Sequence, residues 1–148
     1  MQKTISITQD IPRERVENLL CDALEGGSNY WYMIKDKIEP VGEGFAYYGS
    51  HNEKKTKYLH LYPLQEGGAL MIDDSNADEP ELKEPVRLDW ARVKEGLRLW
   101  ALDAMKDDED KTRGAHPRLW ADFIKDNTDA ETADCFLQYC IFGKVIYG

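Results

Sequence analysis

The sequence lacks long apolar runs. No stretch of its 148 residues approaches the roughly 20 apolar residues that a membrane-spanning helix requires. The alternating segment Thr4–Thr8 follows the first residues directly and leaves no room for a signal peptide. These absences predict a soluble, cytoplasmic protein without a membrane partner.

Cysteine and histidine are scarce as well. Cys21, Cys135 and Cys140 are odd in number and lack Cys-x-x-Cys spacing, and the three histidines are dispersed. This usage suits a reducing compartment, and we expect all three cysteines to be small buried apolar residues. The sequence has no phosphate-binding loop, no dinucleotide-binding glycine turn and no His-Glu-x-x-His motif. We therefore expect no metal and no cofactor, and no catalytic residue can be assigned.

Positive charge is in short supply. The net charge is −9, and residues 73–134 hold 18 acidic against 10 basic side chains. Residues 30–62, by contrast, hold four acidic residues and five lysines. A nucleic-acid-binding domain is typically basic, because it neutralises phosphates. The acidic balance argues against direct nucleic-acid binding.

The apolar spacing predicts several helices in one domain of residues 1–148. A chain of this length can bury roughly 68–70% of the surface that its unfolded form exposes. We expect a first helix after Asp10, ended by positive φ at Gly26-Gly27. A second follows the cap Asp89, and a third begins near Pro117. A capping box, Thr128 to Glu131, opens a fourth helix, and Gly143 ends it.

Between the helices, alternating and aromatic runs predict an antiparallel sheet of about four to six strands. The expected strands are Thr4–Thr8, Tyr30–Lys35, Gly44–Tyr48, Lys57–Tyr62 and Ala69–Asp73. Pro85–Leu88 and Val145–Tyr147 are candidates for a further short strand. With helices packed before and after the sheet, the predicted fold class is α+β.

Two acidic segments offer a surface for a partner. Residues 74–84 form a polar loop, and residues 106–114 form a charged linker. Clustered carboxylates can bind a basic protein surface and speed association with it. The candidate partner-binding residues are Asp73, Asp74, Asp78, Glu79, Glu81, Asp107, Asp108, Glu109 and Asp110.

The stretch "EGGSNYWY" (residues 25–32) has two interpretations. It is either a helix stop followed by core aromatics, or part of an aromatic sheet face that stacks a nucleotide or a nucleotide signal. The candidate residues for the second interpretation are Asn29, Tyr30, Tyr32, Tyr47, Tyr58, His60 and Tyr62. A further alternative is a metal-dependent enzyme that uses C-terminal carboxylates, namely Asp126, Asp129, Glu131 and Asp134.

Three stretches are distinctive: "VENLLCDAL" followed by "EGGSNYWY", the helical "LDWARVKEGLRLWA", and the closing "DAETADCFLQYCIFGKVIYG". Together, about half of the chain, they resemble a recurring family of short phage and prophage proteins. The EGGSNYW motif and the ETAD-x-FLQ...FG...YG tail are its most specific parts. The resemblance implies a virus-encoded accessory protein that acts in a bacterial host's cytoplasm, and it supplies no catalytic residues.

With the acidic charge, this context makes one function the leading hypothesis. We expect an accessory binding protein that inhibits a host defence or nucleic-acid-handling complex through its acidic surfaces. Its expected partner is a host protein with a basic surface, and self-association into a homo-oligomer stays open. The small-ligand binder and the metal-dependent enzyme are the alternatives.

Overall fold

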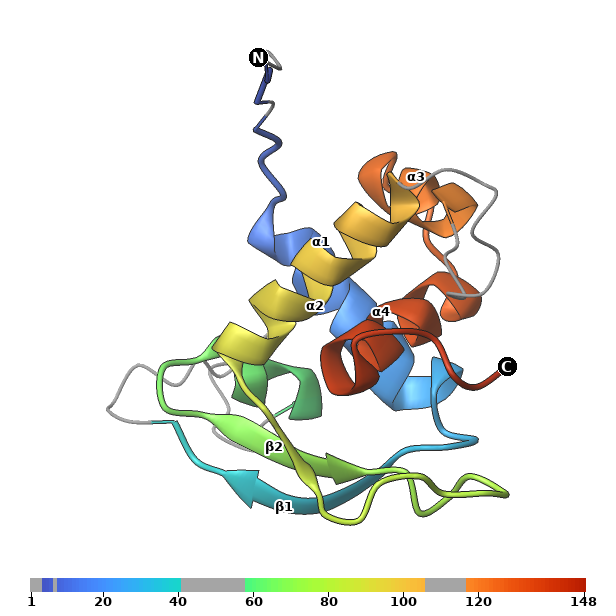
Figure 1. Cartoon of the computed structure of the whole chain (residues 1–148). Helices are drawn as coiled ribbons and strands as arrows, with labels where there is room; N and C mark the ends of the chain where they lie inside the picture. The colour runs from blue at the N-terminus through green and yellow to red at the C-terminus, as the bar shows by residue number, and fades with distance from the viewer. Residues whose placement is uncertain (1–3, 7, 41–57, 106–116) are drawn as a thin grey trace.

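The computed structural model describes residues 4–6, 8–40, 58–105 and 117–148 (Figure 1). In this part of the chain, helices gather on one side of a small antiparallel sheet, so the predicted α+β class is confirmed. The α-helices are α1 (Arg13–Asp22), α2 (Trp90–Ala104), α3 (Pro117–Ile124) and α4 (Ala130–Phe142). The strands are β1 (Met33–Ile38), β2 (Ala69–Asp73) and β3 (Val86–Leu88). A π-helical turn, η1 (Ala23–Gly27), continues α1, and a 3-10 helix, η2 (Leu59–Leu64), precedes β2.

The sheet has the order β1-β2-β3, and both strand pairs are antiparallel. In the central strand β2, Leu70 and Ile72 are fully buried, whereas β1 is mostly exposed. One face of the sheet therefore packs against the helices, as in many antiparallel sheets. The described residues hold three strands, fewer than the expected four to six. The expected strand Gly44–Tyr48 lies outside the described residues.

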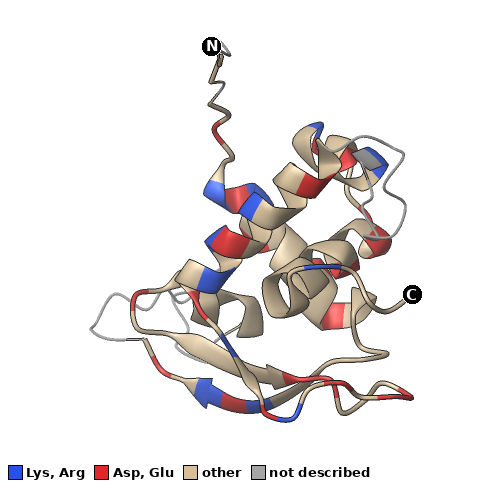
Figure 2. Cartoon of the chain, viewed as in Figure 1, with Lys and Arg blue, Asp and Glu red and all other residues tan. Residues whose placement is uncertain are grey.

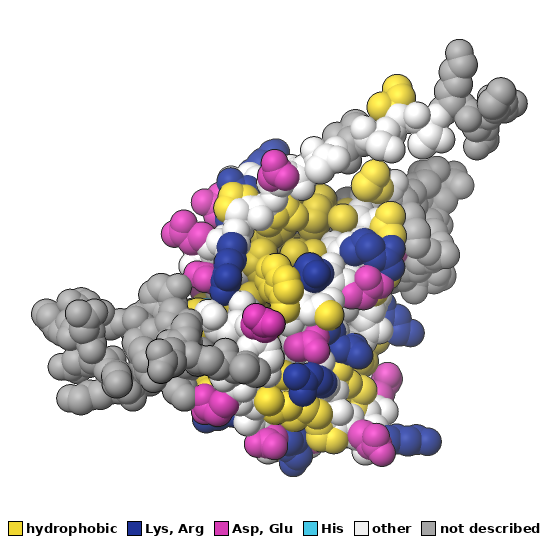
Figure 3. Space-filling view, turned by 90° about the vertical axis from the view of Figure 1, so that its left-hand side faces the viewer, with side chains coloured by type: hydrophobic (Ala, Val, Ile, Leu, Met, Phe, Trp, Pro, Cys, Tyr) yellow, Lys and Arg dark blue, Asp and Glu magenta, His cyan; other side chains and the backbone are white. Residues whose placement is uncertain are grey.

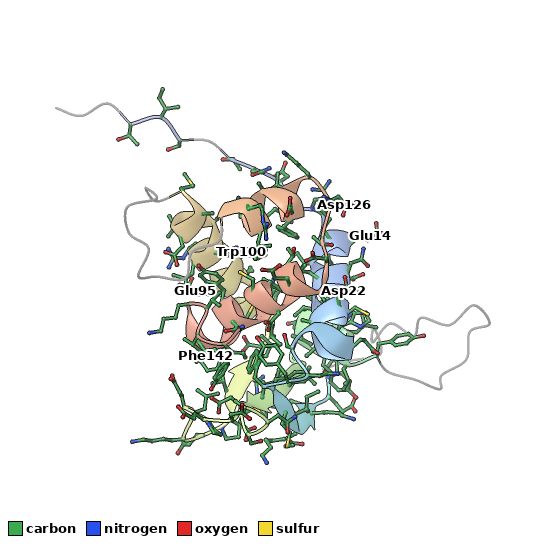
Figure 4. All side chains as sticks on the ribbon, turned by 90° about the vertical axis from the view of Figure 1, so that its right-hand side faces the viewer. Glu14, Asp22, Glu95, Trp100, Asp126 and Phe142 are labelled. Carbon is green, nitrogen blue, oxygen red and sulfur yellow. The ribbon has the colours of Figure 1, made fainter. Side chains whose placement is uncertain are left out.

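Helix α4 is the centre of the core. Every residue from 132 to 141 is buried, and the helix packs against α1, η1, α2 and α3. A helix enclosed on all sides is expected to be largely apolar around its whole circumference. Its close contact with α2 depends on Gly96, where a Cβ would lie 2.8 Å from the Cα of Cys140. In α2, Trp100 (labelled in Figure 4) packs beside Phe123 of α3 and Phe136 of α4.

The predicted N-terminal strand is wrong. Residues 4–6 and 8 have no strand structure, and Figure 1 shows this segment extending away from the body of the molecule. Ile5 is 87% exposed. Alternation alone does not make a strand, because a strand needs a partner to pair its backbone groups.

The predicted role of Gly26 and Gly27 is also wrong. Neither has a positive φ, since both lie inside η1. A Cβ on Gly27 would lie 2.7 Å from the carbonyl oxygen of Ala130, whereas a Cβ on Gly26 would meet nothing within 4 Å. Gly27 is therefore required for the close approach of η1 to the start of α4. The strand predicted at Tyr30 begins only at Met33.

Two further predicted strands are absent at their positions. The predicted strand Lys57–Tyr62 is replaced by η2, which covers Leu59–Leu64. Pro63 inside η2 has no N–H to donate to a strand partner. Residue 57 lies outside the described residues. Val145–Tyr147 is irregular, and the side chain of Gln138 binds its backbone. In contrast, β2 confirms the predicted strand Ala69–Asp73, and β3 confirms the short one near Leu88.

The helix ends were predicted with mixed success. Asp89 caps α2 as predicted, because its Oδ1 accepts a hydrogen bond from the N–H of Arg92 at 3.0 Å. Gly143, with a φ of 73°, ends α4 as predicted. The capping box at Thr128 is wrong, because the cap is Asp129, whose Oδ1 accepts from the N–H of Thr132 at 2.9 Å. The residue before α1 is Pro12, not Asp10.

The cysteines are close to expectation. Cys135 and Cys140 are buried, as predicted, while Cys21 is only half-buried. Burial raises the pKa of the Cys135 and Cys140 thiols well above the usual range. Across the described residues, no helix combines the length and the apolarity needed to cross a bilayer.

Candidate functional site

The segment "EGGSNYWY" and helix α4 meet at Asp134. Its Oδ1 accepts hydrogen bonds from Ser28 Oγ at 2.8 Å and from Trp31 Nε1 at 2.7 Å. Its Oδ2 accepts from Tyr30 OH at 2.5 Å and from Gln138 Nε2 at 3.1 Å. We call these five residues the Asp134 network. Asp134 is only 9% exposed, so these four donors replace the water that its carboxylate would otherwise bind.

For the central residues of "EGGSNYWY", the Asp134 network favours the interpretation as core aromatics. Trp31 is fully buried in the core, and Tyr30 is 49% exposed with its hydroxyl on Asp134. Burial, and then the hydrogen bond to Asp134, raise the pKa of Tyr30 well above its usual value. Tyr30 therefore stays neutral and continues to donate across the physiological range of pH.

Gln138 extends the network to the segment after α4. Its Oε1 accepts hydrogen bonds from the N–H groups of Ile146 and Tyr147, both at 2.8 Å. Its Nε2 also donates to the carbonyl oxygen of Tyr147 at 3.0 Å. Because Gln138 is fully buried, these bonds fix the path of the segment.

Tyr147 connects this segment to the loop between β2 and β3. Its hydroxyl donates to Asp74 Oδ2 at 2.6 Å, and its ring lies 5.8 Å from that of Trp31. Asp74 is 1% exposed and also accepts from the N–H groups of Glu81 and Leu82. Burial acts to raise the pKa of Asp74, but these hydrogen bonds outweigh it and lower the pKa. Asp74 is thus an ionised internal anchor of the loop.

Two hollows are lined in part by residues of the segment 145–148. The first, of about 330 Å³, is lined by Asp134, Gln138 and Glu131. The second, of about 610 Å³, is lined by Asp78, Glu79 and Glu81, and we call it the acidic hollow. Tyr30, Tyr147 and Gly148 line both hollows. None of the described residues that line the acidic hollow is basic.

The acidic candidates fall into three groups. Asp78, Glu79 and Glu81 line the acidic hollow, in the loop whose acidic positions are red beside the sheet in Figure 2. Asp74 is buried, and Asp73 accepts a hydrogen bond from Ser75 and lies 3.8 Å from Lys35, so both carboxylates already have partners within the chain. The remaining four candidates lie outside the described residues: Asp107, Asp108, Glu109 and Asp110.

The aromatic candidates do not share a sheet face. Tyr32 is buried with its hydroxyl donating to the carbonyl oxygen of Leu24, and Tyr62 is buried with its hydroxyl donating to Glu39 at 3.2 Å. Tyr58 directly precedes η2, and its ring stacks on that of His60 within η2, with 5.7 Å between the ring centroids. Burial lowers the pKa of His60, against the smaller opposite effects of nearby glutamates.

Of the last two ligand candidates, Asn29 and Tyr47, only Asn29 lies within the described residues. Asn29 is exposed in the turn before β1, and Tyr47 lies outside the described residues. The predicted platform depended on a strand at Lys57–Tyr62, which η2 replaces.

Three of the four C-terminal carboxylates, Asp129, Glu131 and Asp134, have structural partners. Asp129 caps α4, Asp134 accepts four protein donors, and Glu131 lies 3.7 Å from Arg118. Among the described residues, no three His, Cys, Asp or Glu side chains are grouped to hold a metal ion.

Sequence reasoning missed Ser28, Gln138 and Tyr147 as site residues. For Gln138 a signal was present, because Asp134 and Gln138 are four residues apart in a mostly apolar helix and therefore share a face. No local signal links Ser28 to Asp134, which are 106 positions apart.

The fold and the site thus define a small α+β protein with an acidic hollow beside an irregular C-terminal segment. Comparisons of the chain with protein-family models, with curated proteins and with solved structures found no match.

Proposed function

We propose that this chain is a binding protein that recognises a basic surface of another protein, and that the acidic hollow is its principal contact. The observation behind this proposal is the composition of the hollow, in which Asp78, Glu79 and Glu81 face no basic lining residue among those described. Figure 3 shows a different face of the molecule, on which acidic and basic side chains are interspersed.

The chemistry of the hollow suits an arginine or lysine side chain. Carboxylates bind a guanidinium through paired, charge-assisted hydrogen bonds. The rings of Tyr30 and Tyr147 add faces on which a cation is attracted electrostatically. Asp74 holds the loop from inside, so its acidic side chains are presented without unpaired buried charge.

In its biological setting, we propose a phage accessory protein that inhibits a host defence or nucleic-acid-handling complex. The resemblance of the EGGSNYW motif, of the helical stretch and of the C-terminal tail to phage and prophage proteins supplies that context. An acidic surface can occupy a channel lined by lysine and arginine, and long-range attraction speeds its association. The inhibited partner would then lose access to nucleic acid.

A charge-matched pair of variants tests the contact. The loop variant combines Asp78→Asn, Glu79→Gln and Glu81→Gln. The control combines Glu14→Gln, Asp22→Asn and Asp126→Asn, which remove the same charge from exposed positions outside the hollow (Figure 4). The probe is a labelled arginine-rich peptide, titrated at low and at high ionic strength.

We expect the loop variant to bind the peptide roughly tenfold more weakly, since three weakened ion pairs each contribute a fraction of a kcal/mol or more. The control should lose much less affinity for the peptide. The dependence of this affinity on salt should flatten only for the loop variant. Equal losses in the two variants would show attraction by net charge alone and would contradict a site at the hollow.

A further inference from the structure

The rest of the chain binds the segment 144–148 in the way that a protein binds a peptide ligand. It has no helix or strand, and within the described ranges no backbone–backbone hydrogen bond joins it to another segment. Its backbone is bound by one side chain instead, since Gln138 contacts two N–H groups and one carbonyl of Ile146 and Tyr147. Side-chain amides that pair with backbone groups in this way bind a chain whatever its own side chains are.

Specificity comes from Tyr147. Its ring lies 5.8 Å from the ring of Trp31 and 5.7 Å from that of Phe142. Phe142 is at the end of α4 nearest the sheet (Figure 4). The Tyr147 hydroxyl donates to Asp74 at 2.6 Å. Rings on two sides and a buried carboxylate at the far end select a tyrosine over a phenylalanine, which would leave Asp74 without this donor.

The next position selects glycine. Gly148 has a φ of 87°, and a Cβ there would lie 2.9 Å from the hydroxyl oxygen of Tyr30. We call the surface formed by Tyr30, Trp31, Asp74, Gln138 and Phe142 the tyrosine seat. Its preferred occupant is an irregular segment with a Tyr-Gly pair.

The covalent connection to this occupant is short. Gly143 ends α4 with a left-handed conformation, and the bound segment begins at the next residue. Changing the backbone angles around Gly143 would release the segment without unwinding α4, because glycine adopts many conformations at low cost. Every contact in the seat could then be made by the same segment of another copy.

We propose that the tyrosine seat is a recognition site for the segment Lys144–Gly148 of a second copy of this chain, which replaces the chain's own segment by reciprocal exchange. The chain's own segment has the advantage of an effective concentration on the order of millimolar, so exchange needs a high local concentration of the protein. This inference is independent of whether the acidic hollow binds a basic partner.

The test uses the full chain with Tyr147→Ala, which removes the ring and the hydroxyl from the seat but keeps the residues that form it. The probe is a fluorescently labelled peptide with the sequence of residues 143–148, Gly-Lys-Val-Ile-Tyr-Gly. The control peptide has alanine in place of the tyrosine. If the parent's own segment occupies the seat nine-tenths of the time, the parent should bind the probe about tenfold more weakly than the variant does.

Exchange would be supported if the tyrosine peptide binds the variant saturably. This binding should be at least tenfold tighter than that of the same peptide to the parent, and at least tenfold tighter than that of the alanine peptide to the variant. A natively folded variant that binds both peptides equally, or no better than the parent, would overturn it. Tyr147→Phe is a second variant that keeps the ring and loses only the bond to Asp74. It should bind the tyrosine peptide more tightly than the parent does, and equal binding would again overturn the proposal.

Discussion

Replacing Asp134 by asparagine tests whether the Asp134 network holds the fold together. The substitution keeps the shape of the side chain but exchanges one acceptor oxygen for a donor NH₂ group. Two of the four groups that donate to Asp134 cannot reverse. Trp31 Nε1 is a donor only, and Gln138 Nε2 is fixed because the other end of its amide already accepts two N–H groups.

Either orientation of the asparagine therefore places its NH₂ group against a buried donor. On the Oδ1 side it faces Trp31, and on the Oδ2 side it faces Gln138. One unsatisfied buried donor costs about 1–3 kcal/mol, and losing the charge of the remaining bonds adds to this, so we expect a loss of about 2–4 kcal/mol. That is a large fraction of the roughly 5–15 kcal/mol by which domains are stable.

The assay is urea unfolding of the parent, of Asp134→Asn and of the control Glu131→Gln. Glu131 lies on the same helix with an exposed side chain, so its change should stay within about 0.5 kcal/mol. At constant slope, the midpoint should fall for Asp134→Asn alone. If both variants unfold with the parent, Asp134 is not the buried, fully bonded group that the structure describes.

Three other predictions concern stability. Gly27→Ala should destabilise by about 1–3 kcal/mol because its Cβ meets backbone, while Gly26→Ala should be neutral or stabilising; melting temperatures compare the two. Asp129→Ala should cost about 1 kcal/mol in urea unfolding and Thr128→Ala almost nothing, since only Asp129 caps α4. The lowered pKa of Asp74 stabilises the fold above its unfolded pKa near 3.8, and this stabilisation is lost as the pH falls through the lower folded value. The difference in unfolding free energy between the parent and Asp74→Asn should therefore shrink in acid, and a constant difference would contradict the assignment.

Local signals predicted local structure well. Asp89 and Gly143 were identified as helix ends because capping depends on residues within one turn. The strand at Ala69–Asp73 was found because it is a continuous apolar run in the centre of the sheet. The confirmed parts of the fold are those in which neighbouring residues decide the conformation.

Tertiary contacts decided the rest. Gly27 is a glycine because α4 packs against it, which a sequence pattern cannot distinguish from a helix stop. The aromatic run ending at Tyr62 has the composition of a strand, but it lies in a 3-10 helix that includes Pro63, which has no N–H to donate to a strand partner. The Asp134 network joins positions more than 100 apart, so no local rule could bring them together.

The buried position of Asp74 shows how charge patterns mislead. In the sequence it belongs to an acidic run like any other, and such runs are usually solvated. In the structure its carboxylate is satisfied by Tyr147 and by two backbone N–H groups of its own loop. The loop therefore has one internal and several external acids, and only the external ones are available to a partner.

The two proposed sites should be thermodynamically coupled, because Tyr147 belongs to both. Its ring lines the acidic hollow, and its hydroxyl holds the acidic loop through Asp74. In Tyr147→Ala the hollow lacks this side chain, so binding of the tyrosine peptide should complete it and strengthen binding of the arginine-rich peptide. Coupling is reciprocal, so the arginine-rich peptide must strengthen tyrosine-peptide binding by the same factor. Titrating each peptide with and without the other measures both factors. If neither peptide changes the affinity of the other, the seat and the hollow act independently, even if each binds its ligand.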